Sequence, residues 1–141
     1  MYIGIDIGGT KIAGALVAPG GDIINRIKIA TPARVKAKDI YLCVVDSIDE
    51  LIRASKVKRG RLKGIGLGIP GIVDTRNDHI LAAPNIRLTG FPLSARLKRK
   101  FRVPVAMTND VNAGLLGEVW LGAAKGLDHV VGIFPGTGVG G

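Results

Sequence analysis

Cysteine is scarce in this chain of 141 residues, in which Cys43 is the only one. One thiol cannot form an internal disulfide framework or a cysteine zinc cluster. Its neighbours are apolar and recur at helical spacing, a pattern typical of a small buried side chain rather than a nucleophile. His79 and His129 have no partner at metal-ligand spacing, so we expect no zinc site. The length fits one domain with a core of its own.

A long uninterrupted hydrophobic run is also missing. The most apolar stretch, residues 113–124, carries Glu118, and a membrane-spanning helix needs about 20 predominantly apolar residues. Residues 1–6 begin a strand pattern and lack the basic start, apolar core and cleavage site of a signal peptide. We therefore expect no membrane association and a cytoplasmic protein.

Acidic residues are outnumbered, because 11 Asp and Glu stand against 20 Lys and Arg, for a formal net charge of +9. A basic chain favours anionic partners such as a nucleotide, a polyphosphate or a nucleic acid. The positive charge concentrates in residues 56–63 and 96–102. These stretches either face phosphates or form solvated loops and helix faces, and composition alone does not choose between the two.

The common nucleotide-binding fingerprints are absent or incomplete. A Walker P-loop requires a Gly-Lys pair, which occurs nowhere in the chain. Residues 66–71 and 136–141 match the pattern G-x-G-x-x-G, but the dinucleotide fingerprint needs a helix directly after it. The sequence shows no helix pattern after either stretch, which argues against a Rossmann-type site.

Short runs rich in Ile and Val alternate with turn residues and with helical patterns. The runs predict strands at 2–7, 12–18, 23–30, 62–69, 103–108 and 129–134. Apolar residues at helical spacing predict helices at 39–56, 93–101 and 111–125. The first three strands form an antiparallel meander, and helices then alternate with strands. This order predicts an α/β fold with a mixed sheet covered by helices.

The segment Asp6–Lys11 places a carboxylate at the end of the first strand and two glycines in the turn that follows. Glycines let backbone N–H groups approach an anion closely, and a carboxylate can hold magnesium, usually through water. The alternative is a plain hairpin turn with an incidental Asp. A second turn of this kind, Gly136–Gly138, follows the last predicted strand. Together the two turns favour a cradle for a polyphosphate.

Asp110 lies where a predicted strand gives way to a helix. It either caps the helix by accepting hydrogen bonds from its free N–H groups, or it acts as a general base toward a bound hydroxyl. Position alone leaves both interpretations open. Asn85 and the glycines of residues 66–71 can line a polar small-molecule pocket, with turn formation as the simpler interpretation of each.

Five motifs in this order resemble the ROK family (repressors, open reading frames and kinases). They are DIGGTK at 6–11, GIGLGIPGIVD at 64–74, APN at 83–85, NDVNAGLLGE at 109–118 and GTGVGG at 136–141. The resemblance covers residues 1–141 and corresponds to the amino-terminal half of the family's pattern. It implies a ribonuclease-H-like domain of the actin, Hsp70 and sugar-kinase superfamily, in agreement with the predicted order of elements.

The resemblance implies transfer of the γ-phosphoryl group of ATP, with Mg²⁺, to a hydroxyl of a hexose such as glucose or of an N-acyl-hexosamine. It places the ATP phosphates at Gly8, Gly9, Thr10, Lys11, Thr137 and Gly138, with Asp6 near the magnesium. It places sugar hydroxyls at Gly71, Asn85, Asn109 and Asp110, and it makes Asp110 the catalytic base.

Members of the family continue into a second domain that carries a zinc motif and the rest of the sugar and adenine sites. The resemblance therefore implies that this chain is half of the active unit, with the carboxy-terminal domain as its partner, a homo-oligomeric full-length form and little activity alone. The alternatives are a ROK-type transcriptional regulator, a non-catalytic sugar sensor, and a kinase that uses polyphosphate. Because the chain begins at its first strand, without a helix-turn-helix, we expect no specific binding of nucleic acid.

Overall fold

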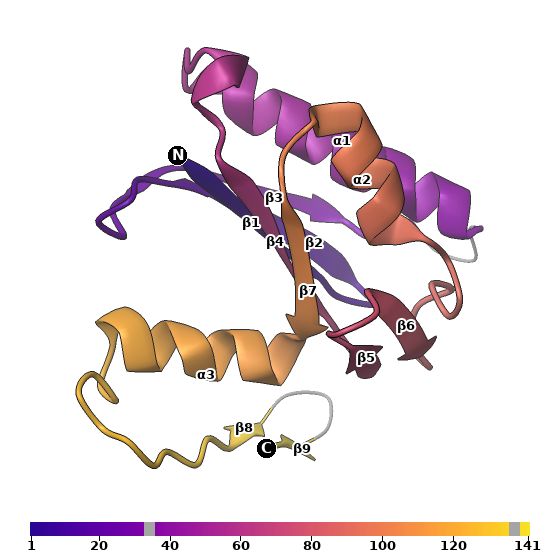
Figure 1. Cartoon of the computed structure of the whole chain (residues 1–141). Helices are drawn as coiled ribbons and strands as arrows, with labels where there is room; N and C mark the ends of the chain where they lie inside the picture. Colours follow the sequence, from indigo (N-terminus) through magenta and orange to yellow (C-terminus); the bar gives the residue numbers. More distant parts are fainter. Residues whose placement is uncertain (33–35, 136–138) are drawn as a thin grey trace.

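A five-stranded mixed sheet forms the centre of the fold (Figure 1). The computed structural model describes residues 1–32, 36–135 and 139–141. The strand order is β3-β2-β1-β4-β7, where the strands are β1 (Tyr2–Ile7), β2 (Lys11–Val17), β3 (Ile23–Ala30), β4 (Gly64–Ile69) and β7 (Val105–Asn109). The first three pair antiparallel, whereas β4 is parallel to β1 and to β7. The predicted α/β class and the predicted meander are confirmed.

Two helices, α1 (Ala37–Ala54) and α2 (Leu93–Phe101), cover one face of this sheet (Figure 1). Alternate residues of β1 point toward them and are buried, and both helices bury an apolar stripe at helical spacing. The buried side chains include Ile3, Ile5 and Ile7 of β1, Val44, Ile48 and Leu51 of α1, and Leu93, Leu97 and Phe101 of α2. Burial of each such side chain contributes roughly 1.5–3 kcal/mol, so the core lies on this side of the sheet.

Helix α3 (Asp110–Leu121) lies on the opposite face, against β4 and β7 (Figure 1). It approaches β4 closely at Gly68, where a Cβ atom would lie 3.4 Å from the Cα of Asp110. All residues of α3 are partly or fully exposed, including the large apolar side chains Leu116, Trp120 and Leu121, which are 62%, 51% and 49% exposed. This side of the sheet therefore presents an apolar helix to solvent.

A short hairpin follows β4 and consists of β5 (Ile72–Asp74) and β6 (His79–Ala82). Its turn is held by Asp74, whose Oδ1 accepts hydrogen bonds from the N–H groups of Arg76 (3.0 Å) and Asn77 (3.1 Å). The sequence analysis predicted neither strand, because three and four residues are too few to show a strand period.

The strand predicted at residues 129–134 is wrong. Within this segment Phe134 begins β8 (Phe134–Pro135), which pairs with β9 (Val139–Gly140), whereas residues 129–133 pair with no described strand. The segment runs beside α3, where a Cβ on Gly132 would lie 2.9 Å from Leu115 Cδ1. A strand requires a partner for its backbone groups, and none of the described strands pairs with residues 129–133.

Both basic stretches lie near the amino ends of parallel strands, since residues 56–63 precede β4 and residues 96–102 precede β7. There Arg59 stacks on Phe101 at 5.0 Å, and both Arg59 and Lys100 form partly exposed ion pairs with Asp49. This placement favours the solvated-face interpretation. Within the described residues, the helices are too short or too polar to cross a bilayer.

We predict that Gly71→Ala destabilises this chain whereas Gly66→Ala does not. Gly71 has φ +127°, and a Cβ there would lie 2.0 Å from Ala82 O, so the variant loses about 1–3 kcal/mol. A Cβ on Gly66 meets no atom within 4 Å, and replacing a strand glycine relieves about 0.5–1 kcal/mol of its conformational cost. Urea unfolding of both variants measures the difference. Equal stabilities would contradict the close packing of the hairpin on β4.

Candidate functional site

The candidate site lies at the carboxyl ends of β1, β4 and β7. From β1 the chain passes to β2 on one side, and from β4 it passes to β7 on the other. In open α/β sheets such a reversal between neighbouring strands leaves a crevice in which ligands bind. Asp6, Gly71 and Asp110 lie at or just after the ends of the three strands. The topology therefore gathers residues from three of the five motifs at one edge of the sheet.

Residues 8–11 form the turn between β1 and β2. The N–H of Gly8 donates to Lys11 O at 2.9 Å, so this donor closes the turn. The N–H groups of Gly9 and Thr10 find no protein acceptor within the described part of the chain, and both residues are exposed. Successive free N–H groups in a turn form a concavity that suits an anion. Gly9 and Thr10, more than Gly8, present such donors.

Gly9 packs against the loop that follows β6. A Cβ on Gly9 would lie 3.2 Å from Asn85 O and 3.4 Å from Asn85 Cβ, so a side chain would push the two loops apart. The turn predicted to bind phosphate is therefore in contact with a residue predicted to bind sugar.

Asn109 is the N-cap of α3. Its Oδ1 accepts hydrogen bonds from the N–H groups of Val111 (2.9 Å) and Asn112 (3.2 Å), which satisfies two of the donors that a helix start leaves free. Its Nδ2 donates to Gly71 O at 2.9 Å. One amide side chain thus ties the end of β4 to the start of α3, and its second N–H is left for a ligand.

Asp110 is the first residue of α3 and not its cap, so the N-cap interpretation of Asp110 is wrong. Asn109 precedes it and caps equally well, which spares Asp110 from that role. Asp110 Oδ1 accepts a hydrogen bond from its neighbour Val111 N at 3.0 Å. Its Oδ2 makes no hydrogen bond among the described residues, so this oxygen is available to a bound group.

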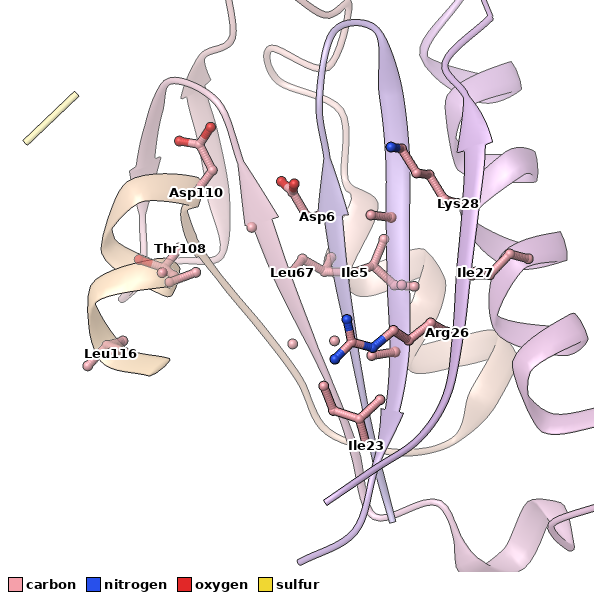
Figure 2. A pocket seen from close by; sticks show the side chains of 18 residues that line it. Ile5, Asp6, Ile23, Arg26, Ile27, Lys28, Leu67, Thr108, Asp110 and Leu116 are labelled. Atoms are coloured by element: carbon pink, nitrogen blue, oxygen red, sulfur yellow. The ribbon is translucent and has the colours of Figure 1, made fainter. Parts of the chain in front are cut away.

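An open groove of about 870 Å³ runs from this edge beside α3. It crosses the part of the sheet opposite α1 and α2 that α3 leaves open, which we call the uncovered face. Figure 2 shows Asp6 and Asp110 near one end of the groove and Arg26 and Lys28 reaching toward it from β3. The strands contribute small residues to its floor, among them Gly4, Ala13, Ala15, Gly66 and Gly68. The groove therefore combines two carboxylates and two cations with a floor of mostly small residues, and Ile23 and Leu116 are among the larger residues that line it.

The charge of Asp110 acts on the carboxyl group of Asp6. Partial burial raises the pKa of Asp6 above its ordinary value of 3.8, and the negative charge of Asp110 raises this pKa further, whereas Lys11 opposes the shift. Two acidic oxygens facing one space are the kind of donor set that a hard divalent cation such as Mg²⁺ prefers. The residues present therefore fit such an ion.

The structure brings together the predicted residues Asp6, Gly8, Gly9, Thr10, Lys11, Gly71, Asn85, Asn109 and Asp110. Thr137 and Gly138 lie outside the described residues. Sequence reasoning missed Arg26 and Lys28, although their alternation within β3 places both on the groove side. It also missed Thr31, which follows β3 and donates its hydroxyl to Gly8 O at 2.6 Å.

The fold is ribonuclease-H-like, as in the actin, Hsp70 and sugar-kinase superfamily. The structure superimposes with a TM-score of 0.86 on a ROK family glucokinase from Streptomyces griseus, solved in complex with glucose and AMPPNP, at 35% identity over 99% of this chain and 42% of that one. The sequence matches the ROK family over residues 2–141. The chain belongs to the ROK family.

Two relatives differ in their stated roles. A glucokinase of Halalkalibacterium halodurans is 36% identical over 99% of this chain and 42% of its own length. A putative xylose repressor of a Caldicellulosiruptor species is 33% identical over 99% of this chain and 35% of its own length. The chain thus spans less than half the length of these relatives.

We predict that Asp6→Asn raises the melting temperature of this chain at pH 7. The pKa of Asp6 is raised in the folded state, so its charged form destabilises the fold at every pH above that raised value. The advantage of Asn fades as the pH falls through the raised pKa toward 3.8, where the carboxyl is increasingly protonated in both states. Thermal unfolding between pH 4 and pH 8 in a chelator measures the effect, with Asp46→Asn on the exposed side of α1 as control. A lower melting temperature for Asp6→Asn at pH 7 would refute the electrostatic cost.

Proposed function

We propose that residues 1–141 are the amino-terminal domain of a sugar kinase that transfers the γ-phosphoryl group of MgATP to a hydroxyl of a hexose or an N-acyl-hexosamine. The observation that carries the proposal is the division of roles at the start of α3. Asn109 caps the helix, while Asp110 keeps one carboxylate oxygen free at the groove. The glucokinase that this chain resembles was solved with glucose and an ATP analogue.

Asp110 is the proposed general base. Its free Oδ2 accepts the proton of the sugar hydroxyl as the hydroxyl oxygen attacks the γ-phosphorus. The new O–P bond forms while the bond between the γ-phosphorus and the bridging oxygen breaks, and ADP leaves with that electron pair. The hydrogen bond from Val111 N to Oδ1 holds the carboxylate in place, so positioning is provided before the sugar arrives.

The phosphates are proposed to lie at the turn of residues 8–11, where Gly9 and Thr10 offer free N–H groups and Lys11 adds a positive charge. Thr137 and Gly138 remain predicted phosphate ligands by resemblance. Asp6, near Asp110, would hold Mg²⁺, which when bound neutralises phosphate charge. Burial raises the pKa of Asp6, and the negative charge of Asp110 raises this pKa further. A bound cation would offset both effects.

The sugar is proposed to lie beside Asn85 and Asn109. Asn109 spends both acceptor sites of its Oδ1 and one N–H on the protein, so its remaining N–H is the group that a sugar hydroxyl can use. Gly71 contributes its backbone, held in place by Asn109.

A second half of the protein is proposed to cover the uncovered face. A second groove of about 810 Å³ lies between the sheet and the end of α3, lined by Tyr2, Val17 and Trp120 among others. Val131 and Ile133 are 91% and 73% exposed and alternate with less exposed neighbours, as in a strand without its partner. Exposed apolar surface of this kind marks an interaction site. The relatives are more than twice as long as this chain, and we propose that the corresponding additional domain packs on this surface.

A transcriptional regulator is the rival function, because one relative is a putative repressor at 33% identity. A regulator should bind one operator tightly at physiological salt. A basic kinase domain with a net charge of +9 should give only salt-sensitive binding that is independent of sequence. Comparing operator and random DNA at two salt concentrations separates the two.

We predict that this chain alone binds MgATP and sugar weakly and turns over little, because no segment among the described residues closes the groove and excludes water. Its kcat should fall far below that of the full-length protein. A coupled assay on both forms measures this. Ordinary kinase turnover by the isolated chain, with kcat on the order of 10 per second, would overturn the proposal that it is half of the active unit.

We predict that Asp110→Asn lowers the kcat of the full-length protein by roughly 10²- to 10⁴-fold, the usual worth of a general base. The Asn side chain retains an oxygen for Val111 N, and Asn109 still caps α3, so folding and sugar affinity should persist. The measurements are kcat, sugar affinity and melting temperature.

Asp46→Asn is the matched control, since Asp46 is exposed on α1 on the covered side of the sheet. It should leave all three quantities unchanged. A kcat for Asp110→Asn within a few-fold of the parent would remove Asp110 from the mechanism.

A further inference from the structure

We infer that Thr31 is a positioning residue that orients the phosphate-binding turn through its side-chain hydroxyl. The inference rests on the proposed function, since it concerns how residues 8–11 recognise a nucleotide. Thr31 lies directly after β3, more than twenty positions from the turn, and it touches the turn twice. Its hydroxyl donates to Gly8 O at 2.6 Å, and its backbone N–H donates to Thr10 O at 3.0 Å.

The first contact fixes the direction of a phosphate donor. A peptide unit is planar and trans, so the carbonyl of Gly8 and the N–H of Gly9 belong to one rigid plane and point in opposite directions. When Thr31 holds Gly8 O, it also sets the direction of the Gly9 N–H. This N–H is exposed and has no acceptor among the described residues, so it is the donor that a phosphate oxygen can reach.

The turn needs such a restraint because its backbone is otherwise free to rotate. Gly8 and Gly9 lack a Cβ, so they populate more backbone conformations than other residues. The Gly8 N–H is tied to Lys11 O at 2.9 Å, but this bond fixes only the peptide plane before Gly8. The plane between Gly8 and Gly9 is held at its carbonyl by the hydroxyl of Thr31.

The two contacts of Thr31 can be removed independently, so a positioning role can be distinguished from a structural one. The backbone bond to Thr10 O continues the pairing of β2 with β3 and survives any substitution that keeps an N–H. The hydroxyl bond requires Thr or Ser. Thr31→Val has nearly the same shape as the parent and removes only the hydroxyl, whereas Thr31→Ser keeps the hydroxyl and removes the methyl group.

The test measures nucleotide and sugar binding separately in the full-length protein. Calorimetry gives the affinity for MgATP, ADP and tripolyphosphate, and steady-state kinetics give KM for ATP, KM for the sugar and kcat. Thr31→Val should weaken binding of all three phosphate ligands by about 3- to 10-fold, the worth of one hydrogen bond. Its sugar affinity and melting temperature should stay near those of the parent. Thr31→Ser should restore nucleotide binding to within about 2-fold.

Three results would overturn the inference. They are parental nucleotide affinity in Thr31→Val, an equal loss of nucleotide and sugar affinity with a lower melting temperature, and an equal defect in Thr31→Ser. If Thr31→Val does not fold, Thr31→Ala replaces it in the comparison with Thr31→Ser. A parent that binds phosphate ligands but phosphorylates no sugar would refute the proposed function alone, since calorimetry still decides the role of Thr31. A parent that binds none of the phosphate ligands would refute both.

Discussion

Parallel pairing of β1 with β4 is the constraint on which the site depends. It sets Asp6 opposite Gly68, and Gly68 in turn pairs with Thr108 of β7. Because Gly68 has no side chain, α3 begins directly over β4, with Asp110 Cα only 3.4 Å from where a Cβ of Gly68 would lie. A Cβ at this point would already be in van der Waals contact with Asp110 and Ala113, so a side chain longer than that of Ala would displace the start of α3. The register and one glycine therefore bring two acids, far apart in sequence, to the same end of one groove.

The negative charge of Asp6 in the groove destabilises the fold. Asp6 is partly removed from water and faces the charge of Asp110, and both effects raise its pKa. Such an arrangement is unfavourable in the free protein and becomes favourable when a cation enters. Functional sites commonly retain interactions of this kind at some cost in stability. Arg26 and Lys28, on the β3 side of the groove, offer positive charge to an anionic ligand or to an acidic stretch of a covering domain.

Much of the fold follows from local patterns in the sequence. Alternating Ile residues predicted β1, and the apolar stripe of α2 predicted its bounds, Leu93–Phe101, without error. The prediction of a strand at residues 129–134 was wrong because a strand depends on a partner, and local sequence does not reveal whether a partner is present. Asn109 and Asp110 are both good N-caps. The sequence analysis considered only Asp110 for the cap, a role that the structure gives to Asn109. The sequence analysis did not identify Thr31, because its hydrogen bond to Gly8 joins residues 23 positions apart and local patterns do not reveal such a contact.

A domain that covers the uncovered face would also close the site. The proposed phosphoryl transfer depends on positioning and charge neutralisation, which require that water be kept from the reacting groups. In this chain the carboxylates of Asp6 and Asp110 open onto a groove of about 870 Å³, where water competes with any ligand. The same groove leaves small residues of the sheet without a covering layer, so a domain that packs there removes apolar surface from water while it closes the site. The contact between Gly9 and Asn85 then lets the two loops proposed to bind phosphate and sugar be fixed together, because movement of either loop displaces the other.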